Sequence, residues 1–88
     1  MTQKQIISLI ENTLENKIAE DENLIKYSFF EMTVKYNLDE KEKAEFLKFL
    51  KIKLENNNYN VYQPGQTYTL NNISREVKEN ELLIAVKK

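Results

Sequence analysis

The stretch YQPGQTY, residues 62–68, contains the chain's only proline and its only glycine, side by side as Pro64 and Gly65. Proline sets φ at about −65° and glycine accepts positive φ, so the pair suits the two central positions of a β-turn. A two-residue Pro-Gly turn matches the twist of paired strands poorly, which favours a loop of residues 63–66. We therefore expect the chain to reverse direction here and to form a hairpin.

The residues on either side of this loop separate into an apolar and a polar face. If Tyr62 pairs with Thr67, then Val61 lies opposite Tyr68. Side chains of a strand alternate with a period of two, so this separation predicts two paired strands. The apolar face carries Tyr59, Val61, Tyr68 and Leu70, and the polar face carries Asn60, Tyr62, Thr67 and Thr69.

Two further reversals extend this pattern to the end of the sequence. Asn71 and Asn72 suit a type I′ turn because asparagine tolerates positive φ, and a loop at residues 78–81 returns the chain once more. We predict an antiparallel β-meander of three to four strands over residues 58–87. A short helix within residues 73–80 is the alternative left open. The apolar face would gain Ile73, Arg75 and Val77 from one strand and Leu82, Ile84 and Val86 from the next.

Amphipathic periodicity predicts three helices before the meander. They span about residues 3–19, 22–37 and 40–56. Thr2 is the expected N-cap of the first helix, and Asp39 with Glu42 forms a variant of the capping box before the third. The asparagine run 56–58 is expected to end the third helix, because asparagine tolerates the left-handed conformation at a C-cap.

The second of these helices is apolar on two sides. Glu31 and Lys35 would form an i,i+4 ion pair in the narrow polar stripe. A helix of this kind has to be covered on both sides, so we expect it at the centre of the fold, with half of a dimer interface as the alternative. Its two faces comprise Ile25, Phe29, Met32 and Tyr36, and Leu24, Tyr27, Phe30, Val34 and Leu38.

The expected fold class is therefore α+β. We expect one domain over residues 1–88, with three N-terminal helices packed on the C-terminal β-meander.

The composition removes most of the groups on which enzymes and metal sites depend. The chain has no cysteine and no histidine, which excludes disulfides, thiolate sites and the commonest acid–base group near neutral pH. A single glycine cannot make a glycine-rich phosphate loop. The acidic run at residues 20–22 is interpreted as a polar joint, since three adjacent carboxylates cannot all face one ion. We therefore expect no catalytic residue, no metal and no cofactor.

Nothing in the sequence indicates a membrane segment or an export signal. Glutamates interrupt the N-terminal segment before a signal-length apolar run can form, and no stretch approaches about 18 apolar residues. We expect a cytoplasmic protein that is a monomer or a weak homodimer.

Two places in the predicted fold suggest contact with another protein. Tyr62 and Leu83 would lie on the outer face of the sheet, and Arg75, the only arginine, is a candidate anchor for a carboxylate or phosphate. Phe49 and Ile52 lie on the flank and far side of the third helix. We therefore expect a small non-enzymatic protein-binding or regulatory module that acts by occupying a partner's surface.

The order of three helices followed by a hairpin resembles winged-helix DNA-binding domains in outline, over about residues 5–70. The resemblance implies that the third helix would enter the major groove and that the hairpin at Pro64 and Gly65 would be the wing. A net charge of −1 and the alternation of lysine with glutamate along the third helix disfavour DNA binding. DNA binding therefore stays an alternative, as does a structural subunit of a homo-oligomer. The DNA-contacting residues would be Lys41, Lys43, Lys48, Lys51 and Lys53.

Overall fold

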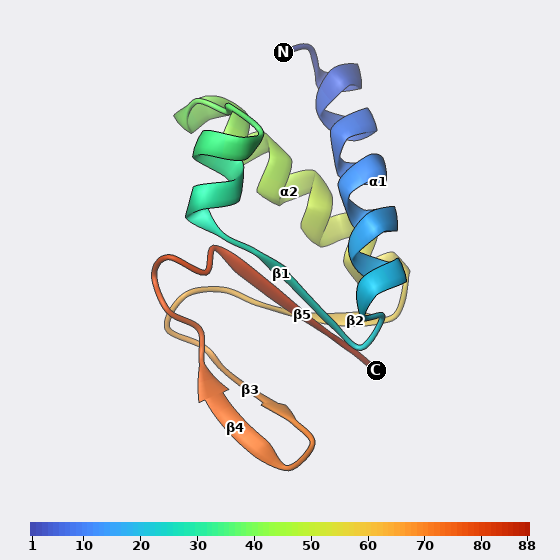
Figure 1. The fold of residues 1–88 in the computed structure, drawn as a ribbon, viewed down its shortest axis with the longest axis vertical. Helices are drawn as coiled ribbons and strands as arrows, with labels where there is room; N and C mark the ends of the chain where they lie inside the picture. Colours follow the sequence, from blue (N-terminus) through green and yellow to red (C-terminus); the bar gives the residue numbers. More distant parts are fainter.

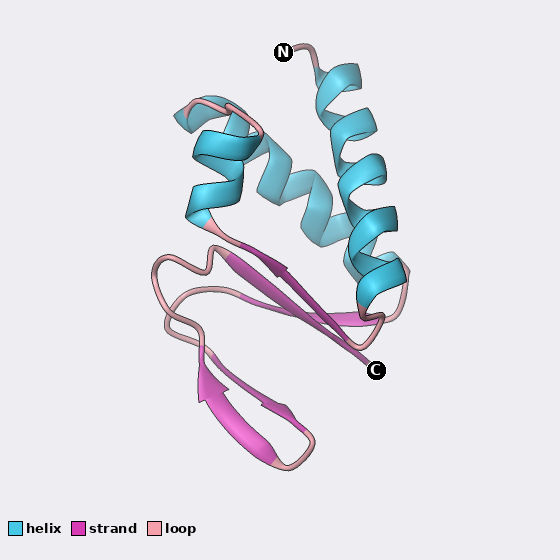
Figure 2. Ribbon diagram, in the orientation of Figure 1, coloured by secondary structure: helices cyan, strands magenta, loops and turns pink.

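Two long helices lie on one face of a small antiparallel sheet, and a separate β-hairpin lies under the opposite face (Figures 1 and 2). The computed structural model describes residues 1–88. The α+β class is confirmed, with two long helices and antiparallel strands in two sheets. The elements in chain order are α1 (Gln3–Glu20), β1 (Leu24–Tyr27), the short π-helix η1 (Glu31–Lys35), α2 (Glu40–Asn56), β2 (Tyr59–Tyr62), β3 (Thr67–Leu70), β4 (Ile73–Glu76) and β5 (Leu83–Lys87).

Both long helices begin at the capping residues that the sequence predicts. The Gln5 N–H donates to the Thr2 hydroxyl (3.2 Å), and the Thr2 N–H donates to the Gln5 side chain (2.8 Å). Asp39 and Glu42 form the same reciprocal box before α2. The second helix ends in the asparagine run, where Asn58 takes a positive φ of 67°. The capping predictions for these two helices are confirmed.

The prediction of a helix over residues 22–37 is wrong in its first half, because Leu24–Tyr27 forms strand β1. This strand runs antiparallel to β5, with Ile25 opposite Ala85. Its residues alternate in exposure, as expected for a strand with one fully buried face. Residues two apart lie on opposite sides of a helix, so Ile25 and Tyr27 also fit a helix that is apolar on two sides. The pairing partner β5 therefore decides the conformation here.

The second half of that predicted helix is one short, wide turn. In η1 the Tyr36 N–H donates to the Glu31 carbonyl, five residues back (2.7 Å). Within this segment Met32 is buried, whereas Phe30 and Val34 are 67% and 60% exposed. The expectation that the segment is covered on two sides is therefore wrong.

Strand β5 lies in the middle of the three-stranded sheet, in the order β1-β5-β2. The predicted meander is wrong in two of its three pairings, because β2 pairs with β5 instead of β3, and β4 does not pair with β5. The predicted pairing of β3 with β4 is confirmed, in a sheet of their own. The central place suits β5 because both of its faces are apolar. Leu83 and Ala85 belong to the main core beneath the helices, and Ile84 and Val86 belong to a smaller core that the hairpin covers.

The turn at residues 63–66 is confirmed, but the expected pairing across it is wrong. The Gln66 N–H donates to the Gln63 carbonyl (3.0 Å), and Gly65 has a φ of 91°. These features, with proline before glycine, define a type II turn. Such a turn splays its flanking strands, and here it carries the chain out of the main sheet and into the separate hairpin.

The hairpin of β3 and β4 reverses at Asn71 and Asn72, whose φ angles are 54° and 64°. Leu70 lies opposite Ile73, which is the register that the predicted type I′ turn requires. The turn prediction is therefore confirmed at this position. The alternative of a short helix within residues 73–80 is excluded by strand β4.

Loss of packing beneath the hairpin should destabilise the whole protein. Ile84 is 0% exposed in the smaller core. We expect Ile84→Ala to lower the free energy of unfolding by about 2–5 kcal/mol in urea titrations, because it leaves a cavity. Asn60→Ala, at an exposed position on the neighbouring strand β2, should change it by less than about 0.5 kcal/mol. An equal loss of unfolding free energy in the two variants would show that β5 is not buried on the face that the hairpin covers.

Backbone conformation, not lack of space, should make Gly65 intolerant of substitution. A Cβ added there would meet no atom within 4 Å, yet the φ of 91° disfavours L-residues. We expect Gly65→Ala to cost about 1–2 kcal/mol of unfolding free energy. A chemically synthesised chain with D-alanine at this position is the matched control and should be at least as stable as the natural chain. Loss of stability with both enantiomers would contradict the explanation.

Candidate binding surfaces

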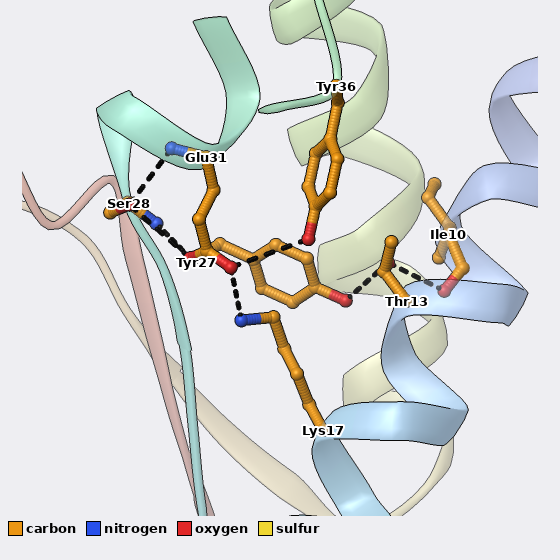
Figure 3. A network of polar contacts seen from close by, with 7 residues as sticks. All are labelled: Ile10, Thr13, Lys17, Tyr27, Ser28, Glu31 and Tyr36. Atoms are coloured by element: carbon orange, nitrogen blue, oxygen red, sulfur yellow. Dashed lines mark hydrogen bonds and ion pairs between the residues drawn. The ribbon is translucent and has the colours of Figure 1, made fainter. Parts of the chain in front are cut away.

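A network of polar side chains joins α1, β1 and η1 (Figure 3). Lys17 Nζ donates to Glu31 Oε2 (2.7 Å), and the Ser28 N–H donates to the other carboxylate oxygen, Oε1 (3.0 Å). The hydroxyls of Thr13 and Tyr27 share a hydrogen bond of 2.9 Å. Glu31 thus pairs with a lysine of α1, and the expected ion pair between Glu31 and Lys35 is not formed.

Burial and charge act together on the titratable groups of this network. Burial alone would raise the pKa of the Glu31 carboxyl, but hydrogen bonds from Lys17 and Ser28 outweigh it and hold the pKa below its usual range. Burial also raises the pKa of Tyr27 and, with the neighbouring Glu31 charge, raises the pKa of Tyr36 to about 12. Both phenols therefore stay protonated near neutral pH, and the network serves to connect three elements of the fold.

Tyr62 and Leu83, expected on the outer sheet face, and Arg75, expected among the apolar side chains of the other face, lie in three different environments. Leu83 is 1% exposed and faces the helices, so it is part of the core and not of a surface. Tyr62 is half-buried, with its ring centroid 6.0 Å from that of Tyr68. Arg75 is exposed on β4 and forms no ion pair. The structure does not bring these side chains together into one patch.

Phe49 and Ile52, in contrast, line one hollow on the helical layer. Ile7 of α1 joins them, and we call the hollow between these two helices the α1–α2 groove. Its volume is about 310 Å³. Ile52 is 51% and Ile7 is 38% exposed, whereas Phe49 is half-buried. The remaining lining residues are Ile10, Lys53, Asn56 and Asn57.

A second exposed apolar cluster lies at the start of η1, in the segment for which the sequence left half of a dimer interface as the alternative. Phe29, Phe30 and Val34 are 46%, 67% and 60% exposed. The ring of Phe29 is covered by the Lys43 ammonium at 4.2 Å from its centroid, which leaves Phe30 and Val34 as the bare part. The available signal was the excess of apolar residues in this short segment, which we interpreted as a helix buried on two sides.

The lysines of α2 are not equivalent. Lys43 is 6% exposed, and its Nζ donates to Glu40 (2.8 Å) and to Thr33 (3.1 Å). Lys53 is half-buried beside the α1–α2 groove. The three that lie exposed along the helix are Lys41, Lys48 and Lys51.

Comparison with known proteins gives no match for this chain, whether among protein-family models, curated proteins or solved structures. Neither long helix carries an apolar stretch that would suffice to cross a bilayer. No cluster of three or more acidic side chains is arranged to hold a metal ion.

The Glu31 network should give a pH-dependent contribution to stability. Because the folded pKa of Glu31 lies below its unfolded value, its charge stabilises the fold above the unfolded pKa, and this stabilisation is lost as pH falls through the folded pKa. We expect Glu31→Gln to cost about 1–3 kcal/mol at pH 7 in urea titrations, and the difference from the natural chain to shrink below about pH 4.5.

The matched control for this prediction is Glu15→Gln, which changes an exposed glutamate of α1 outside any ion pair. It should cost less than about 0.5 kcal/mol. A Glu31→Gln penalty that stays constant down to about pH 3 would contradict the assigned role of the carboxylate.

Proposed function

We propose that this protein is a small non-enzymatic protein-binding module that acts by occupying a partner's surface, with the α1–α2 groove as its contact site. The observation that carries the proposal is the exposure of Ile52 and Ile7 at a hollow that the half-buried Phe49 also lines. Contiguous apolar surface of this kind, rimmed by polar residues, is typical of interaction sites on soluble proteins. A hollow lined by an aromatic side chain can seat one apolar side chain of a partner.

The charges around the groove favour a partner with acidic groups beside that apolar side chain. Lys53 lines the hollow, and the Lys48 ammonium lies 5.9 Å from the centroid of the Phe49 ring. A partner carboxylate at the rim would meet these lysines at the edge of a desolvated contact, where charge pairs affect orientation and association rate.

DNA binding is the second candidate function, and three exposed lysines along α2 favour it. Only part of the winged-helix outline remains, because residues 24–27 form a strand and the turn at Pro64 and Gly65 does not join two paired strands. Against this, Lys43 is engaged within the protein, and Glu45 and Glu55 stand among the remaining lysines. A phosphate approaching α2 would meet charges of both signs. Fold outline alone does not establish function, so this candidate ranks second.

A homo-oligomer is the third candidate. Two copies could cover the exposed Phe30 and Val34 of η1 with each other's apolar side chains, as in an isologous dimer. Sedimentation of the natural chain against Phe30→Glu measures this directly. A dimer that dissociates with Phe30→Glu while the fold is kept would favour the oligomer.

The main test compares two surface variants. Partners are isolated by cross-linking to tagged protein in its native host after nuclease treatment. We expect Ile52→Glu to reduce recovery of the bound protein at least about tenfold, because a charge enters the groove. Lys41→Glu combined with Lys51→Glu, at two exposed lysines of α2 that do not line the groove, should leave most of the recovery intact. Both changes are at exposed positions, so both variants should keep the natural melting temperature.

Duplex DNA separates the first two functions. A DNA-binding protein should bind any duplex with an affinity that falls steeply with salt, because each lysine–phosphate contact releases counterions. Micromolar duplex binding at physiological salt that disappears in the lysine double variant would overturn the protein-binding proposal.

A further inference from the structure

A second groove lies between β1 and the β3–β4 hairpin. The hairpin lies on the opposite side of the main sheet from α1 and α2 (Figure 1). The groove consists of two adjoining hollows of about 220 Å³ and 590 Å³ that share Lys26, Tyr68 and Arg75 as lining residues. Because the hollows share these residues, they form one continuous groove along β1. We call it the β1–hairpin groove.

The two ends of the β1–hairpin groove differ in chemistry. At one end Leu24 of β1 faces Leu70 and Ile73 beside the hairpin tip, and Ile73 is 54% exposed. At the other end Lys26 of β1 meets Arg75 and further charged residues at the hairpin base. Leu24 and Lys26 are two positions apart on the same face of β1, so the apolar and charged ends follow the repeat of a strand.

The charged end has an unpaired cation. Lys26 forms an ion pair with Glu81 (3.3 Å), whereas Arg75 has no acidic partner within the protein. Arg75 lies opposite Tyr68 in the hairpin register. Glu76 and Glu81 line the same hollow, but neither forms an ion pair with Arg75. The Arg75 guanidinium can therefore donate two parallel hydrogen bonds to a carboxylate of a partner protein.

The backbone of β1 is open along this groove. β1 is an edge strand that pairs only with β5. The Lys87 N–H donates to the Asn23 carbonyl, so alternate residues from Asn23 onward direct their backbone groups toward β5. Leu24 and Lys26 consequently direct theirs outward, and outside the ladder they take part in no hydrogen bond. An unpaired edge of this kind can accept an added strand.

We propose that the β1–hairpin groove binds an extended peptide segment of a partner protein, which adds as a strand to the free edge of β1. The segment carries an apolar side chain for Leu24, Leu70 and Ile73, and an aspartate or glutamate two positions away for Arg75. Backbone hydrogen bonds supply affinity in this mode, and the two pockets select the side chains. The proposal goes beyond the function proposed above, because it concerns another surface and stands even if the α1–α2 groove binds nothing.

The spacing of the two side chains is the most specific part of the proposal. Residues i and i+2 of an added strand point to the same face and reach the two ends of the groove together. Residues i and i+1 point to opposite faces, so one of the pair would be directed away from the hairpin. A peptide with the two side chains at adjacent positions should therefore bind at least about tenfold more weakly.

A displayed library of random linear ten-residue peptides, selected against the intact protein, tests these points. We expect enriched sequences to carry an apolar residue two positions from an acidic one. Arg75→Gln should remove the acidic preference, and Lys35→Gln, at an exposed position on η1, should leave it unchanged. Absence of enrichment with folded protein, or the same acidic preference with Arg75→Gln, would overturn the proposal.

A synthetic peptide from that selection then locates the contact. Hydrogen exchange should slow at the amides of Leu24 and Lys26 when this peptide binds, because they gain partners. Lys26→Pro removes one outward N–H but no bond to β5, and should weaken the peptide at least about tenfold while β5 amides stay protected. The Ile52→Glu variant should bind the peptide with unchanged affinity. This result would show that the peptide binds in the β1–hairpin groove and not in the α1–α2 groove. Peptide binding that depends on Ile52 and not on Lys26 would overturn the assignment, as would displacement of the peptide by single-stranded DNA.

Discussion

The burial of β5 on both faces is the constraint on which the rest of the structure depends. The run Leu83 to Val86 is at most 8% exposed, although the strand spans only five residues. One face needs the helices as a cover and the other needs the hairpin, so the layers on either side of the sheet follow from this one strand. Central placement then leaves β1 and β2 as edges, and both are only four residues long, which limits unwanted pairing.

The helix caps and turns could be predicted from the sequence because they depend on neighbouring residues. Which strands pair could not be predicted in the same way, because the partners of β2 and β1 lie far along the chain. The capping boxes of Thr2 and Asp39, the turn at Gly65 and the reversal at Asn71 depend on neighbouring residues alone, and each is present. The partner of β2 is decided by β5, more than twenty residues further on. Alternation shows which side chains share a face but does not show which strand lies opposite. Pairing in sequence order is therefore correct for β3 and β4, which a tight turn joins, and incorrect for β2 and β5.

The segment between β1 and α2 shows how one misassigned element also misplaces a candidate site. An apolar segment read as one helix was expected in the interior, whereas the strand and the short turn of η1 use only part of its apolar residues for the core. Phe30 and Val34 consequently remain exposed. Phe49 and Ile52 were placed more accurately, because α2 has the predicted bounds and its outer side follows from helical periodicity. Ile7 could not be associated with them before the packing of α1 on α2 was known.

The mismatch between a two-stranded hairpin and a three-stranded sheet explains why a groove forms at β1. The hairpin has to cover the outer face of β5, where Ile84 and Val86 need protection from water, and its smaller core also takes in Tyr62 of β2. Leu24 of β1 also packs against this core, but Lys26, two residues further along β1, stays exposed beside Ile73 and Arg75. The groove is thus a geometric consequence of how the apolar strand is covered. Its open backbone edge follows from the place of β1 at the end of the sheet. Its unpaired arginine is an additional feature that the packing of the fold does not require.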